Sequence, residues 1–509
     1  MGDYYTNDMG SLFIQPDGPN GQVFWLGCHD LGDMTEPNGD VSRTFCPDPS
    51  GRGRWTVATR SKGPGGEATV DVTFPIGKTA DYMEVQARRD CPMTLYVNMS
   101  ECGERNVFAD FDSGTVIQSA IISSKARSNL VSRNADGGSP AASTKTFSLS
   151  FLKAEDFYSL VGTRWAHAAA TMLLGIESAG RDRCTGACGA SAEPCEVLIS
   201  TDKAGIAAKT VPYYSTDYGV TWAAGGALNF LVDEDAGPIV TFPVSATVMR
   251  VMLACSETVA AQPAKVCYSD SATLATWTDV AVGATNTEFI NDTFAWSQEA
   301  VYACTDTGGG AAGNVYKSTD GGLTWTQVLA GATDALNYIT FVDAYRGLTV
   351  GDTNEIQWTA DGGSHWTAIT GPAAQAAVNC LSAIVLDDYR WFVGYDDGEI
   401  WYTQDGGTTW SQRVLPIPSG ATAVASVNDM RAVDEYCLWV GVEVTVGGNP
   451  RCALMRSVNG GYSWESFVYA VDSAAGGMNC ITACSYNRCY GAGGVVAATG
   501  LVFEAAEAV

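Results

Sequence analysis

The sequence predicts an all-β protein in two parts, a β-sandwich over residues 1–159 and a β-propeller over residues 160–509. Three observations support this fold class. An octet of turn residues that ends in tryptophan recurs through the C-terminal part, between short β-rich runs. The N-terminal part lacks the octet but alternates apolar and polar residues, which is the period of a half-buried strand. With 56 glycines and 17% charged residues, the composition suits sheets joined by many turns.

The octet is clearest at residues 318–325, which read STDGGLTW. An Asp carboxylate accepts hydrogen bonds from N–H groups of its own turn, and glycine adopts the positive φ that a Cβ resists. The tryptophan adds a large apolar surface for the seam between sheets. Copies follow at 359–366 and 403–410, with a variant at 215–222, an Asn-containing variant at 457–464 and a degenerate copy at 269–277. The defining residues are Asp217, Trp222, Asp270, Trp277, Asp320, Gly322, Trp325, Asp361, Gly363, Trp366, Asp405, Gly407, Trp410, Asn459, Gly461 and Trp464.

The spacing of the octets predicts the propeller. Their tryptophans are 55, 48, 41, 44 and 54 residues apart, and a β-rich repeat of roughly 40–50 residues is typical of propeller blades. Six octets and one truncated repeat at the C-terminal end predict seven blades, with six as the alternative. The truncated repeat needs an edge strand from near residue 160, because a closed ring leaves no strand edge exposed.

The octet resembles the Asp-box, also called the bacterial neuraminidase repeat, of sialidases, sortilin-type receptors and photosystem assembly propellers. The resemblance covers about residues 160–509. It implies a propeller whose boxes lie at the blade periphery, away from the axial face where ligands usually bind. It implies no particular activity, because one fold hosts many functions.

The N-terminal part contains several short strands in its own pattern. Strands are expected at 22–27, 54–60, 68–76 and 93–97, with a polar, turn-rich excursion over 31–49 between the first two. Residues 78–89 are the best helix candidate. The stretch 114–132 is expected to pair with 146–151.

This order resembles the tail-tube fold of long-tailed bacteriophages, a β-sandwich with one helix and a long loop that assembles into stacked hexameric rings. The residues that carry the resemblance are the run LGDMTEPNGD at 31–40, the excursion to Arg60, the alternating strand 68–76 and the Ser-rich segment 123–128. A generic β-sandwich is the alternative interpretation of the same layout.

The charge is strongly acidic. The formal net charge is −27, of which about −6 falls in residues 1–160 and −21 in the remainder. Such a surface repels DNA and acidic membranes, so DNA is expected only as passing cargo and a membrane is not expected as a partner. No apolar run of membrane-spanning length and no signal peptide is visible. We therefore expect synthesis in a bacterial host cytoplasm and a final location in a virion.

Sixteen cysteines leave three interpretations open: disulfides, buried thiols and zinc. Zinc is the weakest, because no CxxC occurs and the chain has only three histidines. Ten cysteines are close enough in sequence to suggest local disulfides: Cys91, Cys102, Cys184, Cys188, Cys195, Cys437, Cys452, Cys480, Cys484 and Cys489.

No catalytic motif is evident. A sialidase uses three converging arginines, a Tyr nucleophile with a Glu partner and a further acid/base group, and the Phe/Tyr-Arg-Ile-Pro segment that opens those enzymes is missing. No carboxylate pair stands out for another glycosidase. We therefore expect no enzyme activity, no catalytic residue, no cofactor and no metal site.

The first functional hypothesis is a non-enzymatic structural protein of a phage virion, most simply the tail-tube subunit. Its N-terminal domain would bind copies of itself in hexameric rings, alongside other virion proteins, and its propeller would decorate the outside. The alternative is a propeller that binds a surface glycan or a protein, as in an adhesin or receptor-binding module. The third hypothesis is a glycosidase of sialidase type.

Overall fold

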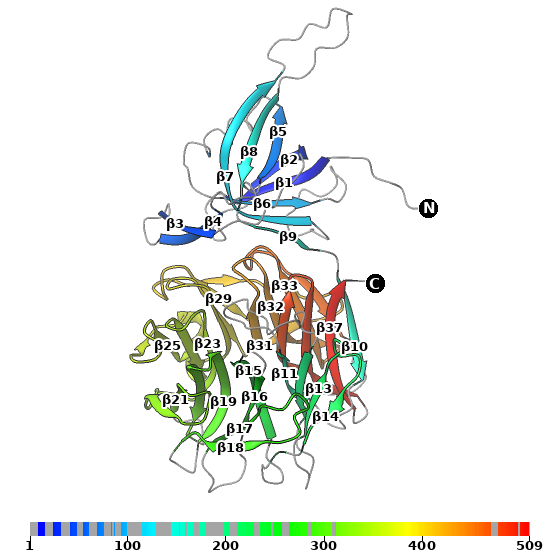
Figure 1. Cartoon of the computed structure of the whole chain (residues 1–509). Coiled ribbons are helices and arrows are strands. Elements are labelled where there is room, and N and C mark those ends of the chain that lie inside the picture. The colour runs from blue at the N-terminus through cyan, green and yellow to red at the C-terminus, as the bar shows by residue number, and fades with distance from the viewer. Residues whose placement is uncertain are drawn as a thin grey trace, which may run out of the picture. The chain divides into compact units, whose positions relative to one another are not determined.

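The computed structural model of the chain is built almost entirely of β-strands and divides into two compact units (Figure 1). One unit comprises Met1–Ser159 with Val458–Ser463, and the other comprises Leu160–Ser457 with Trp464–Val509. No helix among the described residues is long and apolar enough to cross a membrane. The structure describes residues 9–15, 24–31, 41–47, 54–60, 69–75, 83, 86, 93–98, 114–128, 144–151, 153–157, 160–166, 173–179, 197–202, 211–226, 228, 235–245, 248–256, 264–283, 288–307, 312–469, 477–496 and 499–507.

The described strands of the N-terminal unit form one antiparallel sheet and a separate hairpin. The sheet has the order β6-β1-β2-β5-β8-β7-β9, and β6 also pairs with β7, so the sheet closes on itself. The long strand β7 makes this closure, because its first half pairs with β6 and β9 and its second half with β8. The strands are β1 (Met9–Gln15), β2 (Phe24–Leu31), β3 (Val41–Pro47), β4 (Arg54–Arg60), β5 (Thr69–Pro75), β6 (Met93–Asn98), β7 (Gly114–Ser128), β8 (Thr144–Ser150) and β9 (Lys153–Phe157).

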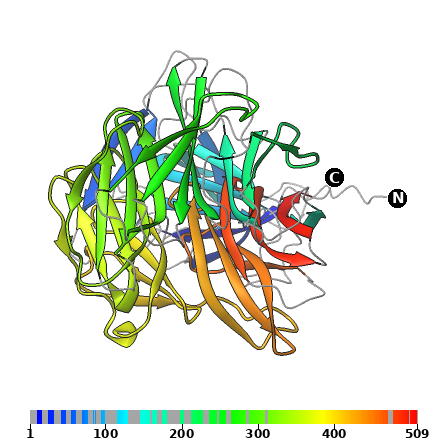
Figure 2. The same cartoon turned by 90° about the horizontal axis from the view of Figure 1, so that it is seen from below.

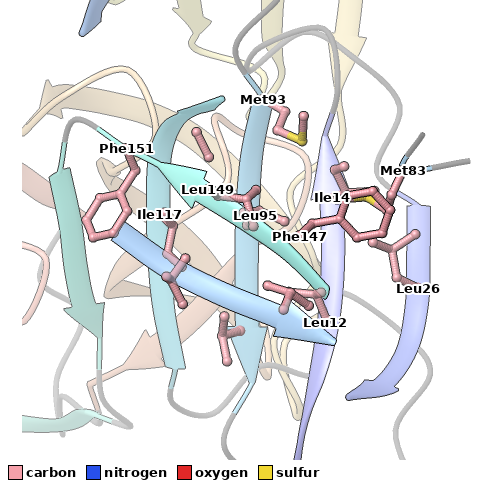
Figure 3. Packing of buried hydrophobic residues seen from close by; sticks show 14 residues of the cluster. Leu12, Ile14, Leu26, Met83, Met93, Leu95, Ile117, Phe147, Leu149 and Phe151 are labelled. Carbon is pink, nitrogen blue, oxygen red and sulfur yellow. The ribbon is translucent and has the colours of Figure 1, made fainter. Parts of the chain in front are cut away.

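The closed sheet has its own hydrophobic core (Figure 3). On β5, Val70 and Val72 are buried whereas Asp71 between them is exposed, so the predicted alternation is confirmed over residues 69–72. The register places Val70 opposite Leu149 and Val72 opposite Phe147 of β8, all four in one cluster. Burying such aliphatic and aromatic side chains stabilises the sheet by about 1.5–3 kcal/mol each.

Two further predictions for this unit can be compared with the structure. The predicted pairing of 114–132 with 146–151 is confirmed for residues 121–128, which pair with β8, whereas 114–120 pair with β6 and β9. The excursion over 31–49 is not turns alone, because β3 lies within it and pairs with β4. Its apolar residues Val41 and Phe45 are separated by three polar residues, so the local pattern does not predict a strand. The seven sheet strands belong to one sheet, so the two-sheet sandwich stays a prediction.

The second unit contains seven four-stranded antiparallel sheets among its described residues. Six of them take four consecutive strands each, and the seventh combines three C-terminal strands with β10. We call each sheet a blade and its first strand the inner strand. The blades are β11 (Leu173–Ala179), β12 (Val197–Asp202), β13 (Pro212–Ser215), β14 (Ala223–Ala224); β15 (Asp235–Ser245), β16 (Val248–Ser256), β17 (Lys265–Ser269), β18 (Thr278–Ala281); β19 (Phe289–Ser297), β20 (Ala300–Asp306), β21 (Gly313–Ser318), β22 (Thr326–Leu329); β23 (Leu336–Phe341), β24 (Gly347–Gly351), β25 (Ile356–Thr359), β26 (Thr367–Ala368); β27 (Cys380–Val385), β28 (Trp391–Tyr395), β29 (Ile400–Thr403), β30 (Ser411–Arg413); β31 (Ala423–Ala432), β32 (Leu438–Val446), β33 (Asn449–Ser457), β34 (Glu465–Val468); and β35 (Met478–Ser485), β36 (Arg488–Val496), β37 (Thr499–Glu507), β10 (Leu160–Ala166). Two short 3-10 helices, η3 (Asp352–Asn354) and η4 (Ala373–Gln375), lie between strands.

The seven inner strands form a closed ring, which makes this unit a β-propeller (Figure 2). Each inner strand contacts the next, from β11 through β15, β19, β23, β27 and β31 to β35, and β35 contacts β11 again. The edge strand expected near residue 160 is β10, which pairs with β37 along seven residues from Leu160 to Ala166. The first strand of this unit thereby joins the last blade, and the ring has no gap in its strand order.

The hydrophobic core of the propeller lies in the seams between blades. One seam cluster combines Ile384, Phe392 and Ile400 of the β27–β30 blade with Val427 and Val440 of the β31–β34 blade. The same arrangement recurs at five other seams. The five blades from β11–β14 to β27–β30 therefore have apolar clusters on both faces, which holds them in fixed positions around the axis.

Candidate functional site

The repeated octets lie at one end of the blades, in the turn between the third and fourth strands. In the copy at 318–325, Asp320 Oδ1 accepts the Thr324 N–H at 2.9 Å and Oδ2 accepts the Thr324 hydroxyl at 2.6 Å. Ser318 Oγ accepts the N–H of Gly322 at 2.8 Å. Burial raises the pKa of Asp320, but hydrogen bonds from Thr324, Ser318 and the Leu323 N–H outweigh it and lower the pKa to about 2. Both oxygens of the carboxylate are thus engaged in hydrogen bonds within its own turn.

The Asn-containing octet keeps the same pair of contacts without the charge, with the direction of the hydroxyl hydrogen bond reversed. Asn459 Oδ1 accepts the Ser463 N–H at 3.0 Å, and Asn459 Nδ2 donates to Ser463 Oγ at 2.7 Å. The amide can do this because it offers both an acceptor and a donor, which replaces the two carboxylate oxygens.

The degenerate copy departs from the prediction. Asp270 forms no octet turn in the described contacts and instead binds Arg250 through two hydrogen bonds of 2.7 Å. Ser271 accepts the N–H of Thr273 and Ala275, and Leu274, with φ of +51°, stands where other copies have glycine. Trp277 still donates its Nε1–H to the Leu274 carbonyl at 2.9 Å. One extra residue shifts the turn, so Asp270 points out of it.

The octets connect neighbouring blades. All six octet tryptophans pack into seam clusters: Trp222, Trp277, Trp325, Trp366, Trp410 and Trp464. Glycine carbonyls of the octets accept hydrogen bonds from the preceding blade, as Gly321 does from Arg250 at 2.8 Å and Gly362 from Lys317 at 2.7 Å. The octets therefore hold neighbouring blades together through their tryptophans and glycine carbonyls, and these groups are engaged in contacts within the propeller.

The opposite end of the inner strands carries a second repeated feature that the sequence analysis missed. Every inner strand has a β-bulge, near its start in six blades and midway along β31. The third strand of a blade runs parallel to the first, so the bulges lie at the other end of the blade from the octets. A bulge turns its extra side chain out of the ladder. The extra residues are Leu174, Gly237 with Pro238, Asn291, Asn337, Leu381, Asn428 and Asn479.

Four of these residues are asparagines, and each ties its inner strand to the next one around the ring. Asn291 Nδ2 donates to the Leu336 carbonyl at 2.9 Å, and Asn337 Nδ2 to the Cys380 carbonyl at 3.0 Å. Asn428 Nδ2 donates to Met478 at 2.7 Å. Asn479 Nδ2 donates to the Leu173 carbonyl at 2.8 Å, which joins the last inner strand to the first.

All the bulge residues line one cavity at the propeller axis, with a volume of about 330 Å³. Its wall is completed by further residues of six of these inner strands: Ile176, Glu177, Ile239, Ile290, Asp292, Tyr338, Asp429, Arg431 and Cys480. The cavity therefore forms only when the ring closes, and no single blade contains it. Its volume is at the lower end of the range of ligand sites in proteins.

A buried carboxylate organises one side of the cavity. Asp429, 2% exposed, accepts the Ile481 N–H of the next blade at 2.9 Å and the Tyr338 hydroxyl at 3.0 Å. Arg431 forms an ion pair with Asp429 at 2.6 Å and also contacts the Tyr338 hydroxyl. Tyr338 belongs to β23 and Asp429 to β31, so the tyrosine reaches past β27 at the axis. This network holds the side chains in place without a ligand.

The adjoining wall is also hydrogen-bonded between blades. Glu177 Oε1 accepts the Thr482 hydroxyl at 3.1 Å. Cys480 Sγ accepts the Ile176 N–H at 3.0 Å. Burial, and then the nearby Asp429 carboxylate, raise the pKa of the Cys480 thiol far above its usual range, so Cys480 stays protonated and is a poor nucleophile.

The cavity lacks the features of the enzymes considered from the sequence. Arg431 is the single arginine among its lining residues, whereas a sialidase needs three. In the described part of the chain no group of three or more His, Cys, Asp or Glu residues could hold a metal ion. The lining residues instead place hydrogen-bonding groups beside apolar side chains.

The structure corrects part of the cysteine prediction. Cys437 and Cys452 are buried thiols, as are Cys267, Cys304, Cys380 and Cys489, and Cys480 is a partly buried thiol. Cys452 pairs with Glu443 on the neighbouring strand, six residues from Cys437, so the two lie roughly 20 Å apart along the ladder. That is far beyond the reach of a disulfide.

The other cysteines give a mixed result. Cys480 lies opposite Ala492 and Cys489 opposite Ala483, three positions apart along the β35–β36 ladder, which accounts for their thiol state. Cys484 is disulfide-bonded. The remaining candidates lie outside the described residues: Cys91, Cys102, Cys184, Cys188 and Cys195.

Comparison with known proteins gives fold likeness only. No family model matches the chain. No curated protein sequence matches it either. Solved structures with a similar fold include YCF48 bound to a D1 peptide, at 13% identity, a TM-score of 0.47 and coverage of 68% of this chain and 97% of that one. The GH74 xyloglucanase of Xanthomonas campestris is similar at 15% identity and 0.46 over 65% of this chain and 52% of the enzyme. The WD40 propeller domain of Doa1 is similar at 10% and 0.43 over 68% and 98%.

These likenesses agree with a propeller, whose existence is established by the strand pairing itself. At such identities and TM-scores they carry no argument about what this chain binds or catalyses.

Proposed function

We propose that the chain is a binding protein whose propeller recognises a segment of a partner protein in the axial cavity. The observation that carries this proposal is the cavity of about 330 Å³ lined by every inner strand, with bulged side chains turned into it from each blade. Inter-blade hydrogen bonds hold this wall in place, so little conformational entropy is lost when a ligand enters. A glycan is the alternative ligand for the same cavity.

The test uses the full-length protein on a peptide array and on a glycan array, beside a variant whose cavity is filled. Leu381 is suited to filling, because it is one of the bulge residues and an apolar one. Leu381→Trp is expected to abolish binding while the thermal unfolding midpoint changes little. Binding that persists in Leu381→Trp, or the absence of any bound peptide or glycan, would contradict the proposal.

We also propose, as a separate role for the N-terminal unit, assembly with copies of itself into the rings of a phage tail. The support is that its strands form a closed sheet with a hydrophobic core of their own, distinct from the blades. The virion location and the tail-tube role are predictions from the sequence pattern alone.

Electron microscopy of the purified full-length protein tests the assembly role. Stacked rings with a regular repeat are expected. A monodisperse monomer at every concentration would contradict it and would leave the binding role of the propeller in place.

A further inference from the structure

We propose that the axial cavity receives a single basic side chain of the partner, with a guanidinium or primary ammonium group as the part recognised. The inference rests on the proposed binding function and specifies the chemistry of its ligand. Three properties of the wall support it: the direction of its amide groups, its charge and its size.

The four asparagines present acceptors to the cavity. A backbone carbonyl can only accept a hydrogen bond, so each asparagine must turn its Nδ2 towards the carbonyl of the next blade. The amide oxygen then faces away from that carbonyl. Within the described residues, no hydrogen bond uses the Oδ1 atom of Asn291, Asn337, Asn428 or Asn479. A ligand that enters this ring meets acceptors, and it must supply donors.

The charge of the wall favours a cation. The lining residues include three carboxylates, Glu177, Asp292 and Asp429, and one guanidinium, Arg431. Their formal sum is −2, within a chain whose net charge is −27. A cavity with carboxylates in low-dielectric walls concentrates cations, and a chain of this charge attracts them from a distance. An anionic or strongly acidic ligand would meet like charges on entry.

The size and the apolar part of the wall match one long side chain. A cavity of about 330 Å³ is too small to admit a folded domain of the partner. The bulge leucines Leu174 and Leu381, together with Ile176, Ile239 and Ile290, line the same cavity as the polar groups. Lysine and arginine pair an aliphatic stem with a terminal donor group, so they can contact both kinds of wall at once.

The probes are pentapeptides of the form acetyl-Gly-Gly-X-Gly-Gly-amide, titrated calorimetrically into the full-length protein. X is Arg, Lys, citrulline, acetyl-lysine, Glu or Leu. Citrulline and acetyl-lysine keep the length of Arg and Lys but remove the charge. The Arg and Lys peptides are expected to bind at least tenfold more tightly than their neutral counterparts, as is typical of charge-assisted hydrogen bonds. Spermidine, as a small cation without a peptide backbone, shows whether the cation alone suffices.

Two matched variants test the ring of acceptors. Asn337→Leu removes one amide oxygen and introduces the residue that two other bulges already carry, and it is expected to weaken the Arg peptide about three- to tenfold. Leu381→Asn adds one acceptor at an equivalent bulge and is expected to strengthen it. Thermal unfolding of each variant reports whether the propeller is intact.

The outcomes separate this inference from the binding function. Preference for neutral or acidic peptides that is lost in Leu381→Trp would overturn the basic-ligand inference and leave the binding function standing. Equal affinity of Arg and citrulline peptides would do the same. Binding of no peptide, or binding that Leu381→Trp leaves unchanged, would overturn both. Tighter binding of the Arg or Lys peptide, weakened by Asn337→Leu, would support the inference.

Discussion

The two ends of the propeller blades are held together by different kinds of contact. At the octet end, the hydrogen bonds of a carboxylate stay within its own turn, as from Thr324 to Asp320 four residues away. At the bulge end they cross between blades, as from Asn479 to Leu173, which are 306 residues apart in sequence. The octet end receives bonds from the preceding blade at its backbone carbonyls, as Gly321 does from Arg250. The bulge end encloses a cavity of about 330 Å³.

This difference shows that a conspicuous repeat can be structural while the candidate site carries no motif. A turn that repeats in every blade must make the same local contacts each time, so its sequence repeats as well. The cavity wall repeats less strictly, because four blades contribute an asparagine and the other three contribute Leu174, Gly237 with Pro238, and Leu381. The following experiments challenge that contrast, starting with the largest expected effect.

Asp429→Ala is expected to cost about 2–4 kcal/mol of propeller stability, because it leaves the partly buried Arg431 and the Ile481 N–H without their carboxylate. Urea unfolding monitored by tryptophan fluorescence measures the change. The matched variant is Asp320→Ala at the octet end, where the carboxylate bonds only within an exposed turn and the expected cost is about 1 kcal/mol. Equal costs for the two would remove the contrast between the ends.

Gly407→Ala is expected to cost about 2–4 kcal/mol. Its φ is +81°, and an added Cβ would lie 2.3 Å from Cγ2 of Ile369 on the neighbouring blade. Gly420 is the control, because it has a similar φ of +85° and nothing within 4 Å of an added Cβ. Gly420→Ala should therefore cost only the backbone strain, about 1 kcal/mol. If both variants lose the same free energy of unfolding, close packing of the octet glycine does not hold the blades together.

Asn479→Leu is expected to cost about 1 kcal/mol, the usual net worth of a neutral hydrogen bond. Asn428→Leu, which removes the equivalent bond inside the ring, should cost the same. Differential scanning calorimetry of the two compares them. A much larger loss in Asn479→Leu would mean that closure between β35 and β11 is the weak point of the ring.

The octet carboxylates should make a small contribution to acid unfolding. The His365 side chain and its N–H lower the pKa of Asp361 to about 2, below the ordinary value of 3.8. A depressed folded-state pKa stabilises the protein above about pH 4, and that stability is lost as the pH falls towards 2. Asp361→Asn imitates Asn459 of the sixth octet. Its urea midpoint should therefore fall less than that of the wild type between pH 4 and pH 2, and an identical fall would contradict this account.

Much of the propeller could be predicted from the sequence, because its turns are encoded locally. The octets mark the third and fourth strands of six blades, and the alternation at Val70 and Val72 predicts a strand that the structure contains. Asp270 does not take the octet role, because it stands one position early and Ser271 accepts the N–H groups of the turn instead. The spacing of Cys437 and Cys452 suggests a disulfide, but the β32–β33 hairpin places Cys452 opposite Glu443, six residues away from Cys437.

The bulge ring could have been suspected from one weak signal. An asparagine follows an apolar residue near the start of several inner strands, as in Ile290-Asn291, Leu336-Asn337 and Met478-Asn479. A single asparagine of this kind is common in turns, and nothing in the local pattern shows that it points to an axis.

The sequence by itself determined the repeating turn, the blade period and the acidic charge, because each depends on residues within one repeat or on a simple sum. Only the tertiary structure decided where the cavity lies and what lines it. Glu177 and Thr482 meet there across 305 residues of chain. That meeting depends on β10 completing the last blade and on β35 packing against β11, and long-range closure of this kind leaves no mark in a local sequence pattern.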